Sequence, residues 1–322
     1  MHISIFDNPL FHQLRDTDNI LIAGAGGGFD VYSGVPLLLA LHAQGKKVHL
    51  ANLSFSFLHE KLMEKEVLSC FKVTKASDNA SIISYFPEKQ LVDWLFLHLQ
   101  EEFPIYVFNL MGVRELTQIY QHLIEKLNIG AVVLVDGGTD SLVFVNESDL
   151  GTPSEDFLSM AALHQVKGNV KKFLVNLGFG IDHFHGVSHY DILHNISQLA
   201  SERAYLGSFS LHNTSEEAQA FLDLVAYANQ RTPQQESIVC NSVASAVEGH
   251  FGNYHATNRT GFSELFINSL MNIYWVFDLE GVIKYNLIIP HLLQTNNGDE
   301  VRQMITEVRR HLLIKERKSV PL

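Results

Sequence analysis

The chain has 322 residues and a formal net charge of −12, with 46% hydrophobic and 18% charged residues. Such a composition supports a large apolar core and excludes a disordered chain. The excess of negative charge argues against a nucleic-acid backbone or an anionic membrane as the main partner.

No targeting or membrane segment is evident. No apolar run reaches the roughly 18 residues that a membrane-spanning helix needs. Residues 1–7 lack the basic and apolar regions of a secretory signal. The cysteines, Cys70 and Cys240, form no motif, so no disulfide framework is expected. We therefore expect a cytoplasmic protein; whether it forms homo-oligomers is left open.

The first predicted element is a buried strand that ends in a glycine loop. An apolar run at residues 20–23 leads into four glycines within residues 24–28, followed by Asp30. Pro36 then stands in the first turn of a predicted helix, where proline is tolerated. Because a helix N-terminus offers free N–H groups and a positive dipole end, this segment predicts a site for a small anionic ligand. The expected binding residues are Gly24, Gly26, Gly27, Gly28 and Asp30.

The glycine loop departs from the fixed nucleotide-binding patterns. Phe29 occupies the sixth position of the dinucleotide pattern, where glycine is required, and no P-loop lysine follows. A Walker-type nucleoside triphosphatase is therefore disfavoured. A tight turn that binds no ligand is the alternative interpretation.

Strand-like and helix-like segments alternate through the first two thirds of the chain. Strands are expected at residues 47–53, 104–110, 130–135 and 172–177, with an edge-strand candidate at 80–86; helices are expected at 88–101, 113–126, 153–166 and 188–203. This alternation predicts an α/β fold, with a mostly parallel, doubly wound (Rossmann-like) sheet and helices on both faces. We expect a single α/β domain over residues 1–322, in which residues 236–322 form a lid or C-terminal elaboration.

Five predicted strands end in small or polar residues. These ends are residues 24–30, 52–54, 109–112, 136–140 and 176–182. Ligands bind beyond the carboxyl ends of parallel strands, so we expect the side chains of these ends to gather at one edge of the sheet. This placement adds Ser54 and Asn109 to the expected ligand-binding residues.

The sequence from Asp136 to Asp140 is a glycine turn directly after a buried strand. Two carboxylates four residues apart can converge on a divalent cation, on sugar hydroxyls or on a water molecule. Ordinary turn chemistry is the alternative. Asp136 and Asp140 are therefore candidate metal ligands, Asp136 is also a candidate catalytic residue, and Gly137, Gly138, Thr139 and Asp140 are candidate ligand-binding residues.

A histidine-rich loop spans residues 178–189. Its histidines and Asp182 suit general acid–base chemistry, so Asp182, His183 and His185 are candidate catalytic residues. Neither a helical histidine pair with its glutamate nor a cysteine set for zinc is present. A solvated polar loop is the alternative.

A second polar loop follows a predicted helix of small residues at 242–247. It contains Glu248, His250 and Arg259, which we expect to bind a ligand if the loop closes over the sheet edge. A long solvated loop is the alternative. The basic run at residues 315–318 is interpreted as a solvated end.

Together these motifs resemble the DUF1152 family of uncharacterised proteins. The resemblance rests on the glycine loop with residues 34–37, and on residues 136–140, 180–189, 248–252 and 277–279, so it covers most of the chain. It implies a single long domain and no established activity. The glycine loop is also similar to the NAD-binding loop of sirtuins, which implies an NAD-like nucleotide, although the spacing to Gly34 is longer and no zinc-binding cysteine set is present.

Three functional hypotheses remain. The first is an enzyme that binds a nucleotide-like or ribosyl-phosphate ligand and uses Asp and His in hydrolysis or glycosyl transfer, because a cleaved glycosidic bond needs a protonated leaving group and an activated water. The second is a non-catalytic nucleotide or NAD sensor, or a partner-binding protein. The third is a metal-dependent hydrolase of another ester or amide. A divalent cation or an NAD-like nucleotide is the expected cofactor.

Overall fold

A computed structural model describes residues 4, 6–59, 62–77 and 85–320. A large sheet contains β1 (Asn19–Gly24), β2 (Lys47–Leu53), β3 (Glu64–Val67), β4 (Cys70–Val73), β5 (Ile105–Phe108), β6 (Ala131–Gly137), β7 (Lys171–Leu177), β8 (Tyr205–Ser210) and β11 (Ile273–Asp278). Their spatial order is β3-β4-β5-β2-β1-β6-β7-β11-β8. Two short strands, β9 (Gly252–Asn253) and β10 (Phe266–Ile267), form a separate antiparallel pair.

The centre of the large sheet is parallel and its edges are antiparallel. Strands β5, β2, β1, β6 and β7 all run in the same direction. At one edge, β4 is antiparallel to β5 and β3 to β4. At the other edge, β11 is antiparallel to both β7 and β8. The predicted mostly parallel, Rossmann-like α/β fold is confirmed.

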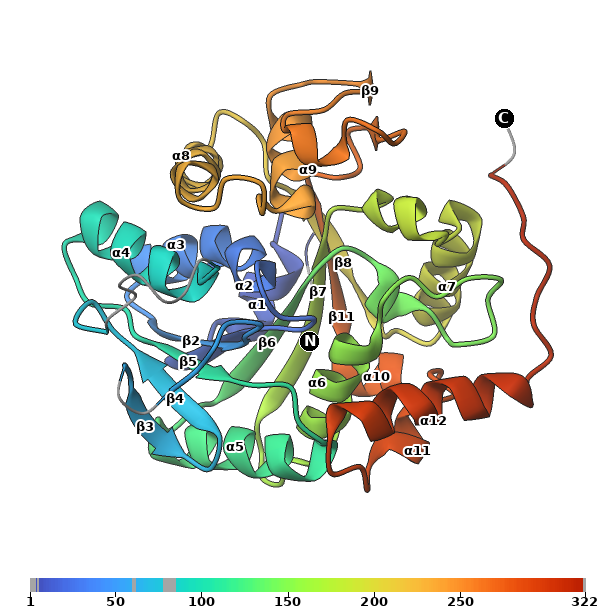
Figure 1. Cartoon of the computed structure of the whole chain (residues 1–322), viewed down its shortest axis with the longest axis horizontal. Helices are drawn as coiled ribbons and strands as arrows, with labels where there is room; N and C mark the ends of the chain where they lie inside the picture. The colour runs from blue at the N-terminus through green and yellow to red at the C-terminus, as the bar shows by residue number, and fades with distance from the viewer. Residues whose placement is uncertain (1–3, 5, 60–61, 78–84, 321–322) are drawn as a thin grey trace.

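Helices cover both faces of this sheet (Figure 1). One face carries α1 (Pro9–Leu14), α2 (Asp30–Ser33), α3 (Val35–Ala43), α4 (Pro87–Leu99), α8 (Glu216–Arg231) and α9 (Ile238–Val247). The other carries α5 (Val113–Lys126), α6 (Ser154–Gln165), α7 (His189–Ser201), α10 (Leu279–Ile283), α11 (Ile289–Leu292) and α12 (Gly298–Arg310). Three short 3-10 turns are η1 (Asp140–Leu142), η2 (Ile181–His185) and η3 (Asn258–Thr260).

Two apolar cores follow from the alternation of side chains along each strand. In β1, Ile20 and Ile22 pack in the core under α2 and α3, whereas Leu21 and Ala23 pack in the core shared with α5 and α6. Both faces of the strand are thus buried, which explains its continuous apolar run.

The last third of the chain contributes both to the separate β9–β10 pair and to the large sheet. Residues 236–322, expected as a lid or elaboration, include the β9–β10 pair, but they also supply β11, which lies inside the large sheet between β7 and β8. The edge-strand candidate at residues 80–86 lies mostly outside the described residues. Across the described part of the chain, no helix has both the length and the apolar character needed to cross a bilayer.

The strand order reverses between β1 and β6. From β1 the chain forms β2 to β5 on one side of β1, with β3 and β4 outermost, and it then crosses to the other side of β1 to form β6 and β7. Such a switch point leaves a crevice at the carboxyl ends of the strands, which is where ligands bind in open α/β sheets.

Candidate functional site

A pocket of about 370 Å³ lies at this switch point. Six of its lining residues carry carboxylates, and its two basic side chains are His185 and Arg259. The lining residues are Gly26, Gly27, Phe29, Asp30, Phe55, Asp136, Gly137, Asp140, Thr152, Glu155, Asp156, Asp182, His185, Ser237, Ile238, Val239 and Arg259. The sheet edge therefore brings together the ends of β1, β6 and β7.

The side chain of Asp30 binds a backbone N–H group of the glycine loop. Asp30, the first residue of α2, accepts a hydrogen bond at Oδ2 from the backbone N–H of Gly26, with a separation of 2.6 Å. The backbone N–H of Gly28 donates to the carbonyl of Leu53. The loop was expected to offer its N–H groups to an external anion, but at Gly26 the Asp30 side chain takes that place.

Asp136 is the penultimate residue of β6 and is buried. Its Oδ2 accepts hydrogen bonds from the Ser141 hydroxyl at 2.5 Å, from the Ser141 backbone N–H at 3.3 Å and from the Asn176 amide at 2.7 Å. All three bonds converge on Oδ2, so the carboxylate is fixed in orientation by its neighbours on η1 and β7.

Asp140 and Asp182 are held at the sides of the pocket. Thr152 donates its backbone N–H to Asp140 Oδ2 at 2.8 Å. Thr139 donates its backbone N–H to Asp182 Oδ2 at 2.6 Å and its hydroxyl to the same oxygen at 3.2 Å. Gly138 has a φ of +155°, and a Cβ at this position would lie 2.8 Å from Asp182 Oδ2. Thr139 and Gly138 thus belong to the support of Asp182.

Asp156, in the first turn of α6, completes the floor of the pocket. A Cβ on Gly26 would lie 2.8 Å from Asp30 Oδ2 and 3.0 Å from Asp156 Oδ1, so the two carboxylates meet above this glycine. Ligand oxygens of Asp30, Asp136 and Asp156 all lie within 4.8 Å of one another. Asp156 is 4% exposed, and its Oδ1 has no hydrogen-bond partner among the described residues. A buried, unpartnered carboxylate oxygen indicates a missing cationic or donor partner.

The crowded carboxylates shift one another's pKa. Burial, with the charge of Asp140 as a further cause, raises the pKa of Asp30 to about 7. Burial and then the charges of Asp136, Asp140 and Asp30 raise the pKa of Asp156 well above its ordinary value. The pKa of Asp182 is raised by burial and by Asp140. Several carboxylates at this distance cannot all ionise without a cation.

This arrangement favours a hard cation over a bare anion. Carboxylate oxygens are the preferred ligands of Mg²⁺ and Ca²⁺, and a divalent cation would offset the repulsion among Asp30, Asp136 and Asp156. A phosphate or carboxylate entering alone would meet six acidic side chains. An anionic ligand therefore fits this floor only together with a cation, with Arg259 and His185 on the pocket wall as additional positive partners.

Several predicted site residues lie away from the pocket lining. The carbonyl of Gly28 accepts a hydrogen bond from Asn52, and Gly24 packs against the same side chain. Ser54 is buried and accepts a hydrogen bond from the Ser56 backbone N–H. Asn109 is half-buried at the end of β5. The predicted residues at the ends of β2 and β5 thus do not line the pocket, although Phe55, just beyond β2, does.

Three further predicted residues also point elsewhere. His183 stacks on His189 with ring centroids 5.0 Å apart, and its Nδ1 lies 3.4 Å from Arg317. Glu248 Oε2 and His250 Nε2 lie 3.8 Å apart, and His250 stacks on Tyr254. None of these three side chains lines the described pocket, which leaves His185 as its histidine.

Sequence reasoning missed Asp156 as a site residue. The acid was visible only as part of the first turn of a helix, where Asp is common because it interacts favourably with the helix dipole. The other missed lining residues are Phe29, Phe55, Thr152, Glu155, Ser237, Ile238 and Val239. The position of Asp156, shortly after the Gly151–Thr152 segment that precedes α6, could have suggested a site residue. Its burial, however, depends on the tertiary structure.

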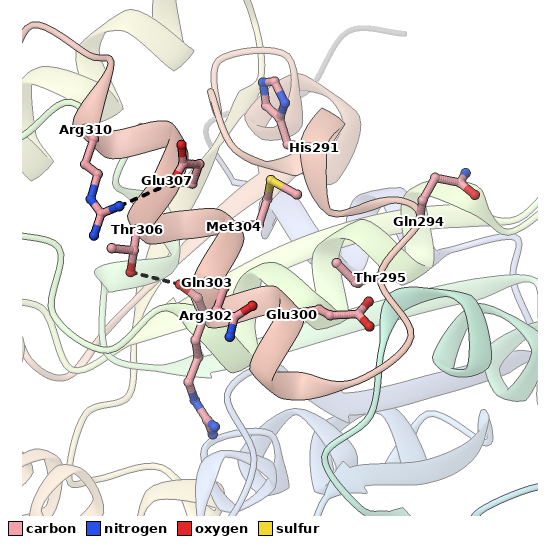
Figure 2. Close-up of a pocket in the computed structure, with 10 residues that line it drawn as sticks. All are labelled: His291, Gln294, Thr295, Glu300, Arg302, Gln303, Met304, Thr306, Glu307 and Arg310. Atoms are coloured by element: carbon pink, nitrogen blue, oxygen red, sulfur yellow. Dashed lines mark hydrogen bonds and ion pairs between the residues drawn. The ribbon is translucent and has the colours of Figure 1, made fainter.

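A larger hollow adjoins this site, since Arg302 in its lining pairs with Glu155 of the acidic pocket at 3.2 Å, but it has a different character. It measures about 730 Å³ and lies along α11 and α12 (Figure 2). Its charged side chains are exposed or half-buried and pair with neighbours, as Arg310 does with Glu307 at 3.3 Å. It combines no buried carboxylates, so size alone does not make it the better candidate.

A comparison with protein families bears on the identity of the chain. The model described as "Protein of unknown function (DUF1152)" matches residues 92–311, which is more than half of the chain. The chain belongs to the DUF1152 family. The DUF1152 match includes Asp136, Asp140, Asp156 and Asp182, whereas Asp30 precedes it. No curated protein and no solved structure matches the chain.

Proposed function

We propose that this protein is a divalent-cation-dependent hydrolase of a small, anionic, nucleotide-like or ribosyl-phosphate substrate. The observation that carries the proposal is the set of Asp30, Asp136 and Asp156 oxygens within 4.8 Å of one another, together with the buried, unpartnered Oδ1 of Asp156. Hydrolysis combines the metal-dependent and the nucleotide hypotheses drawn from the sequence.

The residues divide into three roles. Asp30, Asp136 and Asp156 would hold the cation, which can activate a water molecule and bind substrate oxygens. Asp182 and His185 line the same pocket and would move protons to and from the reacting atoms. Arg259 donates from Nη1 to the Glu236 carbonyl at 2.6 Å, which leaves its other guanidinium donors for a phosphate.

The shape of the pocket supports a substrate with a flat ring. Phe55 lines the pocket and is 56% exposed, so its ring face is accessible at the mouth. An aromatic ring can stack a nucleobase or the nicotinamide of an NAD-like ligand. The acidic floor and the Phe55 wall together fit a ligand with a phosphorylated sugar at one end and a ring at the other.

Cation binding is the first test. Calorimetric titration of the metal-free protein with Mn²⁺, Mg²⁺ and Ca²⁺ should show saturable binding, and Asp156→Asn should weaken it by about tenfold or more. Asp18→Asn is the matched control, because Asp18 is an exposed acid that pairs with Lys46 and does not line the pocket. Equal affinities in the Asp156 variant and the wild type would contradict the metal site.

Turnover is the second test. Cation-loaded protein would be incubated with nucleotides, NAD and sugar phosphates, and the products analysed by mass spectrometry. We expect cation-dependent hydrolysis of at least one member of the panel, lost in Asp136→Asn. Ligand-induced stabilisation without any product would favour the sensor hypothesis instead.

A further inference from the structure

The C-terminal segment crosses the two loops that carry Asp140 and His185. In Figure 1 it leaves α12 and extends past α7. Arg309 in the last turn of α12, together with Lys315 and Arg317 of this segment, contacts these loops, and we call the three residues the C-terminal clamp. The basic run at residues 315–318 was interpreted from the sequence as a solvated end, and these contacts differ from that expectation.

Arg309 binds three backbone carbonyls of the loop between η1 and α6. Its Nη1 donates to Val145 at 2.8 Å, and its Nη2 donates to Glu147 at 2.8 Å and Ser148 at 2.7 Å. Val145 is a buried β-branched residue with a φ of +84°. Such a conformation is strained and persists only where surrounding contacts impose it. Arg309 is one such contact.

Lys315 contacts the same loop at Asn146 and Glu147. The Lys315 backbone N–H donates to Asn146 at 2.8 Å, and its Nζ lies 3.7 Å from Glu147 Oε1. Glu147 is buried and also accepts hydrogen bonds from the Phe144 backbone N–H and the Asn195 amide. The loop thus has a fixed path from Asp140 to Thr152, whose backbone N–H binds Asp140.

Arg317 ties this loop to the loop of η2. Its Nη1 donates to the Gly186 carbonyl at 2.5 Å and lies 3.6 Å from Asp149 Oδ2. Ser188 donates its hydroxyl to the Lys318 carbonyl at 2.9 Å. Gly186 directly follows His185, so Arg317 fixes the backbone next to this pocket residue while its own side chain stays outside the pocket.

We propose that Arg309 and Arg317 are positioning residues for the acidic pocket. Neither lines the pocket, and each acts through the backbone that places Asp140 or His185. The functional part of this inference rests on the proposed cation-dependent activity. The structural part, that the clamp orders both loops, can be measured without it.

The test compares Arg309→Ala and Arg317→Ala with Arg310→Ala. Arg310 is adjacent in sequence, exposed and paired only with Glu307 among the described residues, which makes it a matched control. Hydrogen–deuterium exchange should rise in residues 140–152 for the Arg309 variant and in residues 183–188 for the Arg317 variant. Mn²⁺ affinity should fall by about tenfold in the Arg309 variant, because the loop that Arg309 binds leads into α6 and Asp156, and such a loss is typical of removing support behind a metal site.

Melting temperature and chemical rescue separate positioning from general destabilisation. Arg317 is exposed, so Arg317→Ala is expected to fold with a nearly unchanged melting temperature while its local exchange rises. Added guanidinium should restore Mn²⁺ affinity in Arg309→Ala. Exchange and affinity like those of Arg310→Ala would overturn the inference. A wild-type protein that binds no divalent cation would refute the proposed function. The exchange data alone would then show whether the C-terminal clamp orders the two loops.

Discussion

Asp30 Oδ2 lies 2.6 Å from the backbone nitrogen of Gly26, so the carboxylate that follows the glycine loop folds back onto it. The same carboxylate lies within 4.8 Å of ligand oxygens on Asp136 and Asp156. Asp30 therefore connects two structures, the backbone of the loop and the candidate cation site.

Substitutions of Asp30 should separate these two roles. Asp30→Asn keeps an oxygen that can accept the Gly26 hydrogen bond but loses the negative charge, whereas Asp30→Ala loses both. We expect both variants to bind Mn²⁺ at least about tenfold more weakly. Only Asp30→Ala should show faster hydrogen exchange in residues 25–29. Equal exchange in the two variants would argue against the hydrogen bond as the element that orders the loop.

Removing one carboxylate from the floor should stabilise the metal-free protein. Asp156 is buried among like charges, so Asp156→Asn relieves repulsion, and we expect the free energy of unfolding in the presence of a chelator to rise by about 1 kcal/mol. With saturating Mn²⁺ the wild type should be more stable than Asp156→Asn, because it binds the cation more tightly and binding stabilises the folded state. Urea unfolding under both conditions measures this. A variant less stable than the wild type without metal would refute the account of repulsion.

The buried carboxyl of Glu88 should make stability depend on pH. Its Oε1 accepts a hydrogen bond from Asn52, but burial raises its pKa from 4.5 to about 7. The folded chain thus holds this proton more tightly than the unfolded chain, and the resulting stability is present below pH 4.5 and lost as pH rises to about 7. The loss corresponds to at most about 3 kcal/mol.

Glu88→Gln should remove this part of the pH dependence. Unfolding free energies measured from pH 4 to pH 8 should fall less steeply in the variant than in the wild type. Glu64→Gln is the control, because Glu64 lies on the β3 edge with an exposed side chain. Parallel curves for the wild type and Glu88→Gln would show that Glu88 does not contribute.

Substitution of Arg259 should weaken binding of the organic ligand and leave the affinity for the cation unchanged. Its guanidinium lines the pocket wall, separate from the three carboxylates that gather within 4.8 Å. We expect Arg259→Ala to weaken binding of a phosphorylated ligand by about tenfold, as for loss of a charge-assisted hydrogen bond, with unchanged Mn²⁺ affinity. Arg231→Ala is the control, since Arg231 packs on the Tyr227 ring at the surface. A parallel loss of Mn²⁺ binding would place Arg259 in the cation site.

Local sequence patterns predicted the parallel centre of the fold but not its edges. The run at residues 20–23 and those of β6 and β7 are continuously apolar because both faces of these strands are buried. The segment at residues 265–279 is rich in apolar residues but is interrupted by polar ones, so its pattern does not define one buried strand. It holds both β10 and β11, and the pairing of β11 with β7 and β8 depends on contacts distant in sequence.

The candidate site was predictable where its residues follow strands. Asp30, Asp136, Asp140 and Asp182 stand at or just beyond strand ends, and all four line the pocket. Asp156 stands at a helix start, where no strand rule applies. His183 and His185 are both on η2, but the His183 side chain stacks on His189 and lies against Arg317, contacts that depend on the tertiary structure.

The strained backbone at Val145 has a consequence for how the protein matures. Its carbonyl is bound by Arg309, a residue 164 positions later in the chain. During synthesis on the ribosome, the loop that leads from Asp140 toward Asp156 emerges long before its arginine partner. The parallel strands can form first, and from the proposed role of Arg309 we expect the acidic pocket to acquire its final geometry only when this late segment docks. A nascent chain stalled before Arg309 should therefore carry a formed sheet and an unfinished site.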